Sequence, residues 1–226
     1  MRINIIYISF PSLRIIKSVF RFIKFYFRAA TRYQVHSPFV FEFILRVLDL
    51  KKPEDQNNPG LKKLRSGSWK KKTIVRIVNF YSPKTFLEIA CSDKLSAFYP
   101  INNDSNPLII AETLEEVKTK TEGIKTLDFV RLGSDTQKIN LLDVLNLCLS
   151  KAHDKTVFVF DEIHSIKDRE EVWGQIKSHP KVTVTLDLFH LGVVFIRSQQ
   201  KQKEHFILTP LRWKPFMFFS LGGPKN

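Results

Sequence analysis

The sequence predicts an α/β fold in which a mostly parallel sheet ends in an antiparallel hairpin and is preceded by basic N-terminal helices. From residue 85 onward, short apolar runs alternate with helical stretches, as in a parallel sheet covered by helices on both faces. Two later runs, residues 182–186 and 192–196, are too close for a crossover helix and must pair antiparallel. Residues 1–85 hold 18 Lys/Arg and 4 Asp/Glu, whereas residues 86–226 hold 18 of each, so the excess positive charge lies in the first third.

Length and composition indicate one sizeable globular domain. The chain has 226 residues, of which 43% are apolar and 26% charged, and this balance excludes disorder and fibrous classes. Two cysteines, Cys91 and Cys148, are too few for a disulfide scaffold and indicate a reducing compartment. We therefore expect a cytoplasmic protein.

The elements of this domain can be placed from apolar runs and helix signals. Ser37 and Pro38 are a good N-cap and first residue for an early helix, and another helix at 74–80 must stop before Pro83. These helices belong to a basic, aromatic-rich extension over residues 1–80, followed by the sheet domain at 81–208 and a tail at 209–226. Buried strands are expected at 85–90, 107–111, 129–132 and 156–160, and helices at 115–120, 140–150 and 168–177.

Residues 13–28 predict an amphipathic helix with a narrow basic ridge and a wide apolar face. A helix packed on its own domain, with its cations in water, has this pattern, and so does a helix lying on an anionic membrane surface. Nucleic-acid binding is the third and least favoured alternative. The apolar run before it is broken by Pro11 and followed by cations, so neither a cleavable signal nor a membrane span is expected. The ridge consists of Arg14, Lys17, Arg21, Lys24 and Arg28.

Acidic residues end three of the predicted strands: Glu88, Glu112 and the pair Asp161 and Glu162. Ligands of open parallel sheets bind beyond the carboxyl ends of the strands, where a carboxylate can accept hydrogen bonds from a ribose diol or face a cationic ligand. A solvated strand-end carboxylate is the alternative for each position.

Several sequence strings are similar to those of a known family. They are RYQVHSPFVF at 32–41, RIVNFYSPKTFLE at 76–88, VFDEIHS at 159–165, VWGQIKSHP at 172–180 and VTVTLDLFHLGVVFIR at 182–197. Together they resemble a group of bacterial class I S-adenosylmethionine-dependent methyltransferases that is common in the Bacteroidota. The resemblance covers residues 30–208 and implies a Rossmann-like fold.

The resemblance also implies a cofactor site at the first two strands. Glu88 matches the family's acid at the end of the first strand, Ser92 falls in the loop that follows, and Glu112 matches the acid that contacts the ribose hydroxyls. That loop is normally rich in glycine, which lets the backbone approach the cofactor closely. Here Cys91 and Asp93 stand in a loop without glycine. We therefore expect binding of S-adenosyl-L-methionine to be weak or lost.

Catalytic residues are implied at the end of the fourth predicted strand. Asp161 and Glu162 match the family's acid pair, and His164 could act as a base toward a substrate proton, with a capping or packed histidine as the alternative. In metal-dependent relatives a further aspartate completes a cation site. Here residues 131–135 stand at that place, or the strand and its helix are deleted. No metal site is expected, because two carboxylates make a poor Mg²⁺ site.

Three functions remain open at this point. The first is methyl transfer to an oxygen or nitrogen of a small-molecule or envelope-associated acceptor. The second is a catalytically degenerate methyltransferase-fold protein that binds a partner. The third, compatible with either, is a peripheral protein at the inner membrane face that uses residues 13–28. Fold alone does not decide among them.

Overall fold

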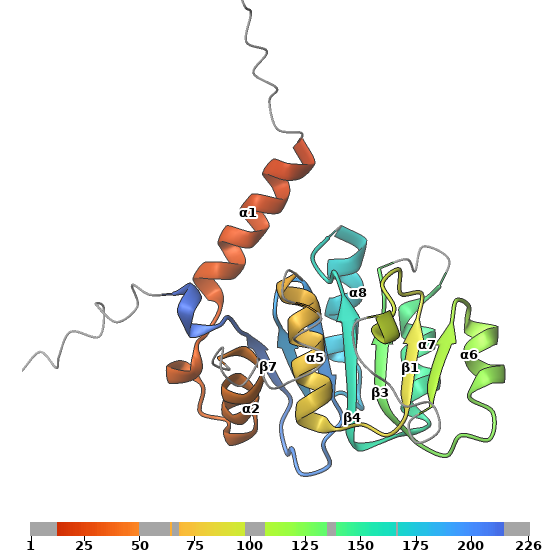
Figure 1. Ribbon diagram of the computed structural model, residues 1–226. Coiled ribbons are helices and arrows are strands. Elements are labelled where there is room, and N and C mark those ends of the chain that lie inside the picture. Colours follow the sequence, from red (N-terminus) through yellow and green to blue (C-terminus); the bar gives the residue numbers. More distant parts are fainter. Residues whose placement is uncertain are drawn as a thin grey trace, which may run out of the picture.

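The computed structural model describes residues 13–49, 64, 68–97, 107–134, 139–165 and 167–214. Its centre is one seven-stranded sheet of order β2-β1-β3-β4-β6-β5-β7 (Figure 1). The apolar run before residue 13 and the end of the predicted tail beyond residue 214 lie outside the described residues. The strands are β1 (Phe86–Ile89), β2 (Leu108–Ala111), β3 (Leu127–Leu132), β4 (Ala152–Asp161), β5 (Val184–Asp187), β6 (Leu191–Phe195) and β7 (Glu204–Ile207).

Strand directions confirm the predicted fold class. Neighbouring strands pair parallel except on both sides of β6, which runs against β4 and against β5. The predicted hairpin is therefore present, formed by β5 and β6. The sheet nevertheless continues one strand further, because β7 pairs parallel with β5. This short edge strand was not predicted, since its four residues carry two polar side chains and no alternating apolar pattern.

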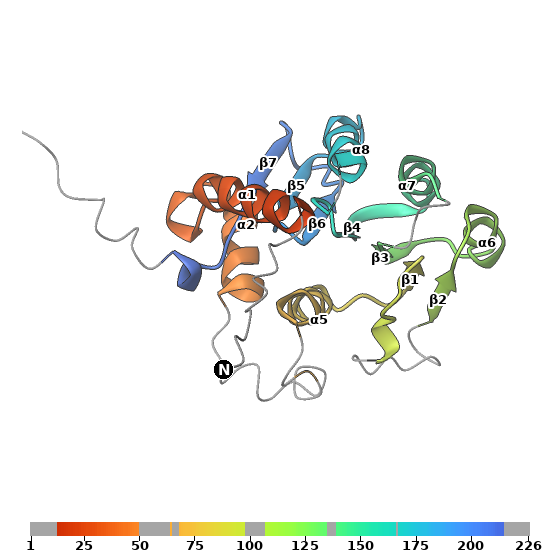
Figure 2. The same cartoon turned by 90° about the horizontal axis from the view of Figure 1, so that it is seen from above.

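Helices cover both faces of the sheet (Figure 2). One apolar core lies under α6 (Leu114–Lys120), α7 (Leu141–Leu149) and α8 (Lys167–Ser178). The other lies under α5 (Trp69–Tyr81), α2 (Pro38–Phe43) and the π-helical turn η2 (Ile44–Leu48). Because side chains alternate along a strand, β1, β2, β3, β4 and β6 contribute to both cores, whereas the apolar side chains of β5 enter only the core under α5. The fold is thus a Rossmann-like, doubly covered sheet.

Local capping explains where two of these helices begin. The Ser68 hydroxyl accepts a hydrogen bond from the backbone N–H of Lys71, and α5 ends before Pro83, as expected. The predicted role of Ser37 is wrong in one respect. Ser37 occupies the N-cap position of α2, but its side chain makes no capping hydrogen bond. Pro38 supplies the helical start by its fixed backbone angle.

The first helix, α1 (Leu13–Arg28), confirms the predicted helical span but not a fully packed apolar face. At its C-terminal end Phe25 and Ala29 are buried against Phe189. Toward its N-terminal end α1 rises from the body of the protein (Figure 1), and Phe20 is 67% exposed. The helix is therefore anchored at one end and largely uncovered at the other.

The pairing of β3 decides where residues 131–134 stand. β3 lies between β1 and β4, with Glu88 opposite Arg131 and Arg131 opposite Val159. Arg131 and the described residues 132–134 therefore occupy the carboxyl end of the strand beside β1. This is the first of the two alternatives that the sequence left open.

Candidate functional site

A row of three charged side chains crosses the carboxyl ends of three adjacent strands. Glu88 lies on β1, Arg131 on β3 and Asp161 on β4, all on the face that α5 covers. Strand alternation places each of them next to an apolar side chain of the same face, such as Phe129 two residues before Arg131. The row therefore lies at the edge of the apolar core.

Arg131 is the centre of this row. Its side chain is fully buried and forms ion pairs with Glu88 at 2.9 Å, with Asp161 at 2.8 Å and with Asp93 at 2.7 Å. Its guanidinium also donates to the backbone carbonyl of Asp93 at 2.7 Å. A buried charge is tolerated only when it is paired and hydrogen-bonded, and these contacts meet that requirement.

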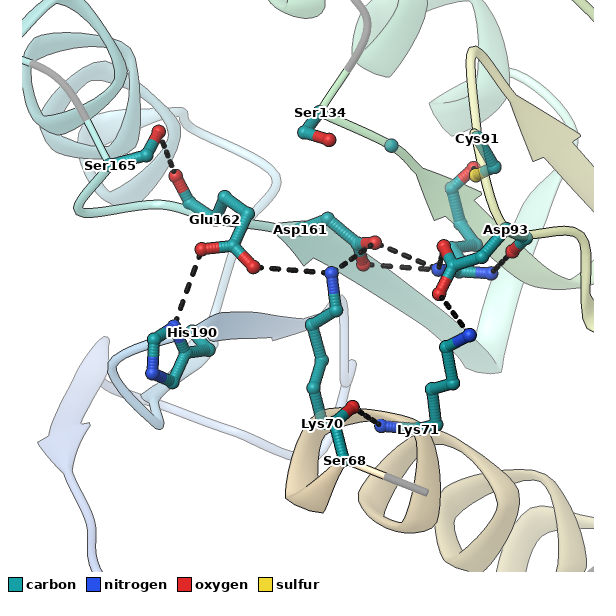
Figure 3. Close-up of polar contacts among 12 residues, drawn as sticks. Ser68, Lys70, Lys71, Cys91, Asp93, Ser134, Asp161, Glu162, Ser165 and His190 are labelled. Carbon is teal, nitrogen blue, oxygen red and sulfur yellow. Dashed lines mark hydrogen bonds and ion pairs between the residues drawn. The ribbon is translucent and has the colours of Figure 1, made fainter. Parts of the chain in front are cut away.

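Two lysines of α5 extend the row into a larger cluster (Figure 3). The Lys70 ammonium lies 3.4 Å from Asp161 and 3.1 Å from Glu162, and Lys71 lies 3.3 Å from Asp93. The first turn of α5 thus delivers two cations to the ends of β1 and β4. We call the whole set the ion cluster; it comprises Lys70, Lys71, Glu88, Asp93, Arg131, Asp161 and Glu162.

The ion cluster shifts the pKa values of its members in opposite directions. Burial raises the pKa of Glu88, although hydrogen bonds from Leu95 and Arg131 oppose the shift. Burial would also raise the pKa of Asp93, but the charge and hydrogen bond of Arg131 bring it below its ordinary value. Burial would lower the pKa of Lys70, yet the nearby Asp161 and Glu162 raise it. Lys70 and Asp93 are thus favoured in their charged forms.

The loop after β1 packs directly on β3. Ala90 adopts a positive φ of 48°, and a Cβ atom at Gly133 would lie 2.0 Å from the Ala90 carbonyl oxygen. Only glycine fits at Gly133, because any side chain would collide with that backbone. Cys91 follows in the same tight loop and is buried, and burial raises its pKa. The loop without glycine therefore packs tightly on the sheet because a glycine, Gly133, directly follows the neighbouring strand β3.

The three predicted cofactor residues lie in different environments. Glu88 is fully buried, and its carboxylate accepts hydrogen bonds from Arg131 and from the Leu95 backbone. The Glu112 side chain is 53% exposed and lies 3.6 Å from Lys94. Ser92 is exposed. As arranged here, these residues do not fit S-adenosyl-L-methionine, because Arg131 already takes the place beside Glu88 that the cofactor's cationic end would need.

The predicted catalytic residues separate into two environments. Asp161 and Glu162 share Lys70, and Glu162 also contacts His190 at 3.3 Å. His164 lies apart from them, with its Nε2 atom 2.7 Å from Asp187. The acid pair therefore belongs to the ion cluster, while His164 belongs to a second group of charges.

The second group holds His164 between two carboxylates. Its Nδ1 atom lies 3.2 Å from Glu170, and its ring stacks on Phe189 at a centroid distance of 5.6 Å. Burial by itself would lower the pKa of His164, but hydrogen bonds and charges of Asp187 and Glu170 raise it above its ordinary value of 6.5. The protonated imidazole is thus stabilised in the folded protein.

We expect His164→Gln to remove a pH-dependent part of the stability. Because the folded pKa is raised, this contribution is fully present below pH 6.5 and is lost as the pH rises through the folded pKa. Wild-type unfolding free energy, measured in urea, should fall over that window, and the variant should lose this fall. His36→Gln, at an exposed histidine, is the matched control. A parallel pH profile for wild type and His164→Gln would contradict the assignment.

Sequence reasoning missed Arg131, the residue on which the site depends. Its signal was an arginine inside an apolar strand, since a cation in such a run needs buried acidic partners. Those partners, Glu88 and Asp161, were instead assigned to a ligand. Among the described residues no cluster of three or more His, Cys, Asp or Glu side chains could hold a metal ion. Cys148 is buried, and burial raises its pKa to about 12.

Comparison with known proteins finds similar solved structures but no matching sequence family. No family model and no curated protein matches the chain. An O-methyltransferase from Bacillus cereus in complex with SAH is similar, at 13% identity and a TM-score of 0.40, covering 69% of this chain and 96% of that one. The SAH-bound methyltransferase PaMTH1 from Podospora anserina is similar at 10% identity and a TM-score of 0.42, covering 86% and 100%. The fold assignment rests on the strand order and directions given above.

Proposed function

We propose that this chain is a catalytically degenerate methyltransferase-fold protein that acts as a binding module and does not transfer methyl groups. One observation carries the proposal: Arg131 is fully buried among Glu88, Asp93 and Asp161 at the strand ends. The Arg131 guanidinium places a positive charge of the protein itself beside Glu88, at the position that a cationic ligand would otherwise occupy.

The energetics of buried ion pairs support this proposal. A ligand that used Glu88 or Asp161 would have to displace Arg131, leaving a buried guanidinium without its partners. Breaking a buried pair in this way costs about 3–5 kcal/mol, which is comparable to the whole binding free energy of a millimolar ligand. At the same edge the loop after β1 packs so closely on Gly133 that not even a methyl group fits between them. Weak or absent binding follows from both effects.

Methyl transfer to an oxygen or nitrogen of an unidentified acceptor is the second candidate. The observation that favours it is the exposure of two carboxylates at the carboxyl edge of the sheet. Glu112 follows β2 and Glu162 follows β4, and both side chains are accessible, at 53% and 28%. A ligand could reach Glu112 and the exposed part of Glu162 without displacing Arg131 from its buried partners.

Titration calorimetry with S-adenosylmethionine, and separately with its demethylated product, distinguishes the two candidates. We expect no heat of binding up to about 1 mM ligand. At that concentration, binding with a free energy smaller than about 4 kcal/mol in magnitude gives no detectable signal. Glu112→Ala should then behave as wild type. Binding at or below about 100 μM that Glu112→Ala abolishes would overturn the proposal and favour methyl transfer.

We further propose that the partner of this module is an anionic membrane surface, reached through α1. The nine large apolar side chains that are most exposed among the described residues all lie between Ile16 and Leu45. Five of them form one stripe along α1 at helical spacing: Ile16, Val19, Phe20, Ile23 and Phe27.

Charges on the same helix favour an anionic surface as the occupant of this stripe. Lys17 and Lys24 are exposed, and neither has a carboxylate within ion-pair distance in the part of the chain that the structure describes. Exposed apolar side chains beside free cations are the pattern of helices that lie in the membrane interface. Arg21 differs, because it pairs with Glu170 and belongs to the body of the protein. Within the described residues, no helix is both long and apolar enough to cross a bilayer.

A further inference from the structure

A cavity of about 420 Å³ lies between α1, α8, β5 and β7. It opens on the face of the sheet opposite the ion cluster. Thr185 and Asp187 line it, whereas Val184 and Leu186, which alternate with them along β5, point into the core under α5. The volume lies in the range of small-molecule sites. The cavity is therefore separate from the strand-end site described above.

Part of the cavity wall is electrically balanced. Glu170 pairs with Arg21 at 3.4 Å and with His164 at 3.2 Å, and Asp187 pairs with His164 at 2.7 Å. Two carboxylates thus face one arginine and one histidine. These four residues hold each other in place and leave no net charge when His164 is protonated.

Three further cations line the cavity without such partners. They are Lys24 and Arg28 of α1 and Lys177 of α8, and none has a carboxylate within ion-pair distance among the residues that the structure describes. Lys24 and Arg28 are four residues apart and so neighbours on one helix face, where like charges repel. A bound anion would relieve this repulsion.

The rest of the lining consists of apolar and aromatic side chains together with Thr185 and His205, which hydrogen-bond to each other at 2.8 Å. Phe25 and Trp173 are buried, at 6% and 2% exposure, and Phe206 and Ile207 complete the surface. The Trp173 Nε1 atom is buried without a hydrogen-bond partner among the described residues. A cavity with three free cations and an apolar wall suits a ligand that carries both an anionic group and an apolar part.

We propose that this cavity binds an organic phosphate. Its phosphoryl group would be held by Lys24, Arg28 and Lys177, and its apolar part would lie against Phe25 and Trp173. A phosphomonoester carries close to two negative charges at neutral pH, so it matches three cations better than a single carboxylate does. Arginine also binds phosphate through two parallel hydrogen bonds. This site shares no residue with the ion cluster, so it does not depend on the outcome for S-adenosylmethionine.

Phenyl phosphate is the probe that tests the site, with binding followed by calorimetry and by tryptophan fluorescence. We expect saturable binding, with the affinity reduced at least tenfold in Lys24→Gln/Arg28→Gln. Lys17→Gln is the matched control, because Lys17 carries the same charge on the same helix but does not line the cavity. No binding, or equal losses in the control and the double variant, would overturn the proposal.

Two further probes test whether the apolar wall contributes to binding and whether the ligand is a lipid or a soluble phosphate ester. Inorganic phosphate should bind at least tenfold more weakly than phenyl phosphate, and equal affinity would contradict the role of Phe25 and Trp173. Monomeric short-chain phosphatidic acid serves as the lipid arm. Tighter binding of this lipid than of phenyl phosphate supports the proposal with a lipid headgroup as ligand, and the reverse order supports it with a soluble phosphate ester.

Discussion

Replacing Arg131 with methionine is expected to destabilise the protein by about 3–5 kcal/mol, the cost of breaking a buried ion pair by removing one partner. Glu88 and Asp161, both almost completely buried, would be left without their common cation. Asp161 keeps Lys70 at 3.4 Å, but Glu88 can escape this cost only by taking up a proton, so the loss should be larger at alkaline than at acidic pH. Urea unfolding followed by circular dichroism measures the change.

Two variants make this prediction specific to the buried pairs. Adding Glu88→Gln and Asp161→Asn to Arg131→Met should recover a large part of the loss, because the uncompensated charges are then gone. Lys71→Met is the matched control, since Lys71 pairs with Asp93 at a partly exposed position and such pairs contribute about 0–1 kcal/mol. A loss below about 1 kcal/mol in Arg131→Met would show that the carboxylates do not depend on the guanidinium.

Removing two apolar side chains from the stripe of α1 is expected to weaken retention of the protein by anionic vesicles at least tenfold. In Val19→Ser/Ile23→Ser two exposed side chains lose their apolar character, and each is worth about 1.5–3 kcal/mol when fully buried in an apolar phase. Partial burial of both still corresponds to at least a tenfold loss of vesicle affinity. Co-sedimentation with phosphatidylcholine vesicles, with and without phosphatidylserine, measures it.

The electrostatic part of membrane binding has its own pair of variants. Lys17→Gln/Lys24→Gln should weaken retention, whereas Lys118→Gln/Lys120→Gln removes the same charge from α6, far along the chain from α1, and should not. Added salt should release the wild type. Equal retention by neutral and anionic vesicles would contradict an anionic partner. Retention by neither, together with a concentration-dependent dimer, would assign the stripe to a second copy of the chain.

The structure changes which cations these experiments should target. From sequence alone, Lys17, Arg21 and Lys24 form one basic ridge. In the fold, Arg21 turns to Glu170 and to the backbone carbonyls of His164 and Ser165, so its loss would disturb the body of the protein as well. Helical periodicity predicts which residues share a face, but it does not predict which of them meets the domain.

The fold class could be predicted because it depends on local patterns that repeat along the chain. Apolar runs separated by helical stretches require a covered parallel sheet, and the short connection between β5 and β6 leaves only an antiparallel pairing. β7 could not be predicted in this way, because its four residues carry no apolar pattern. Its position is determined by pairing with β5.

The sequence by itself determined which side chains stand near the strand ends: Asp161 closes β4, Glu112 and Glu162 follow β2 and β4, and Glu88 is the last residue but one of β1. Only the tertiary structure decided what those carboxylates face. Arg131, 43 residues from Glu88 and 30 from Asp161, satisfies both of them inside the protein, while Glu112 remains at the surface. The physical reason is that a buried charge is stabilised by pairing with the opposite charge that lies nearest to it in space. Strand register and side-chain direction decide which opposite charge that is.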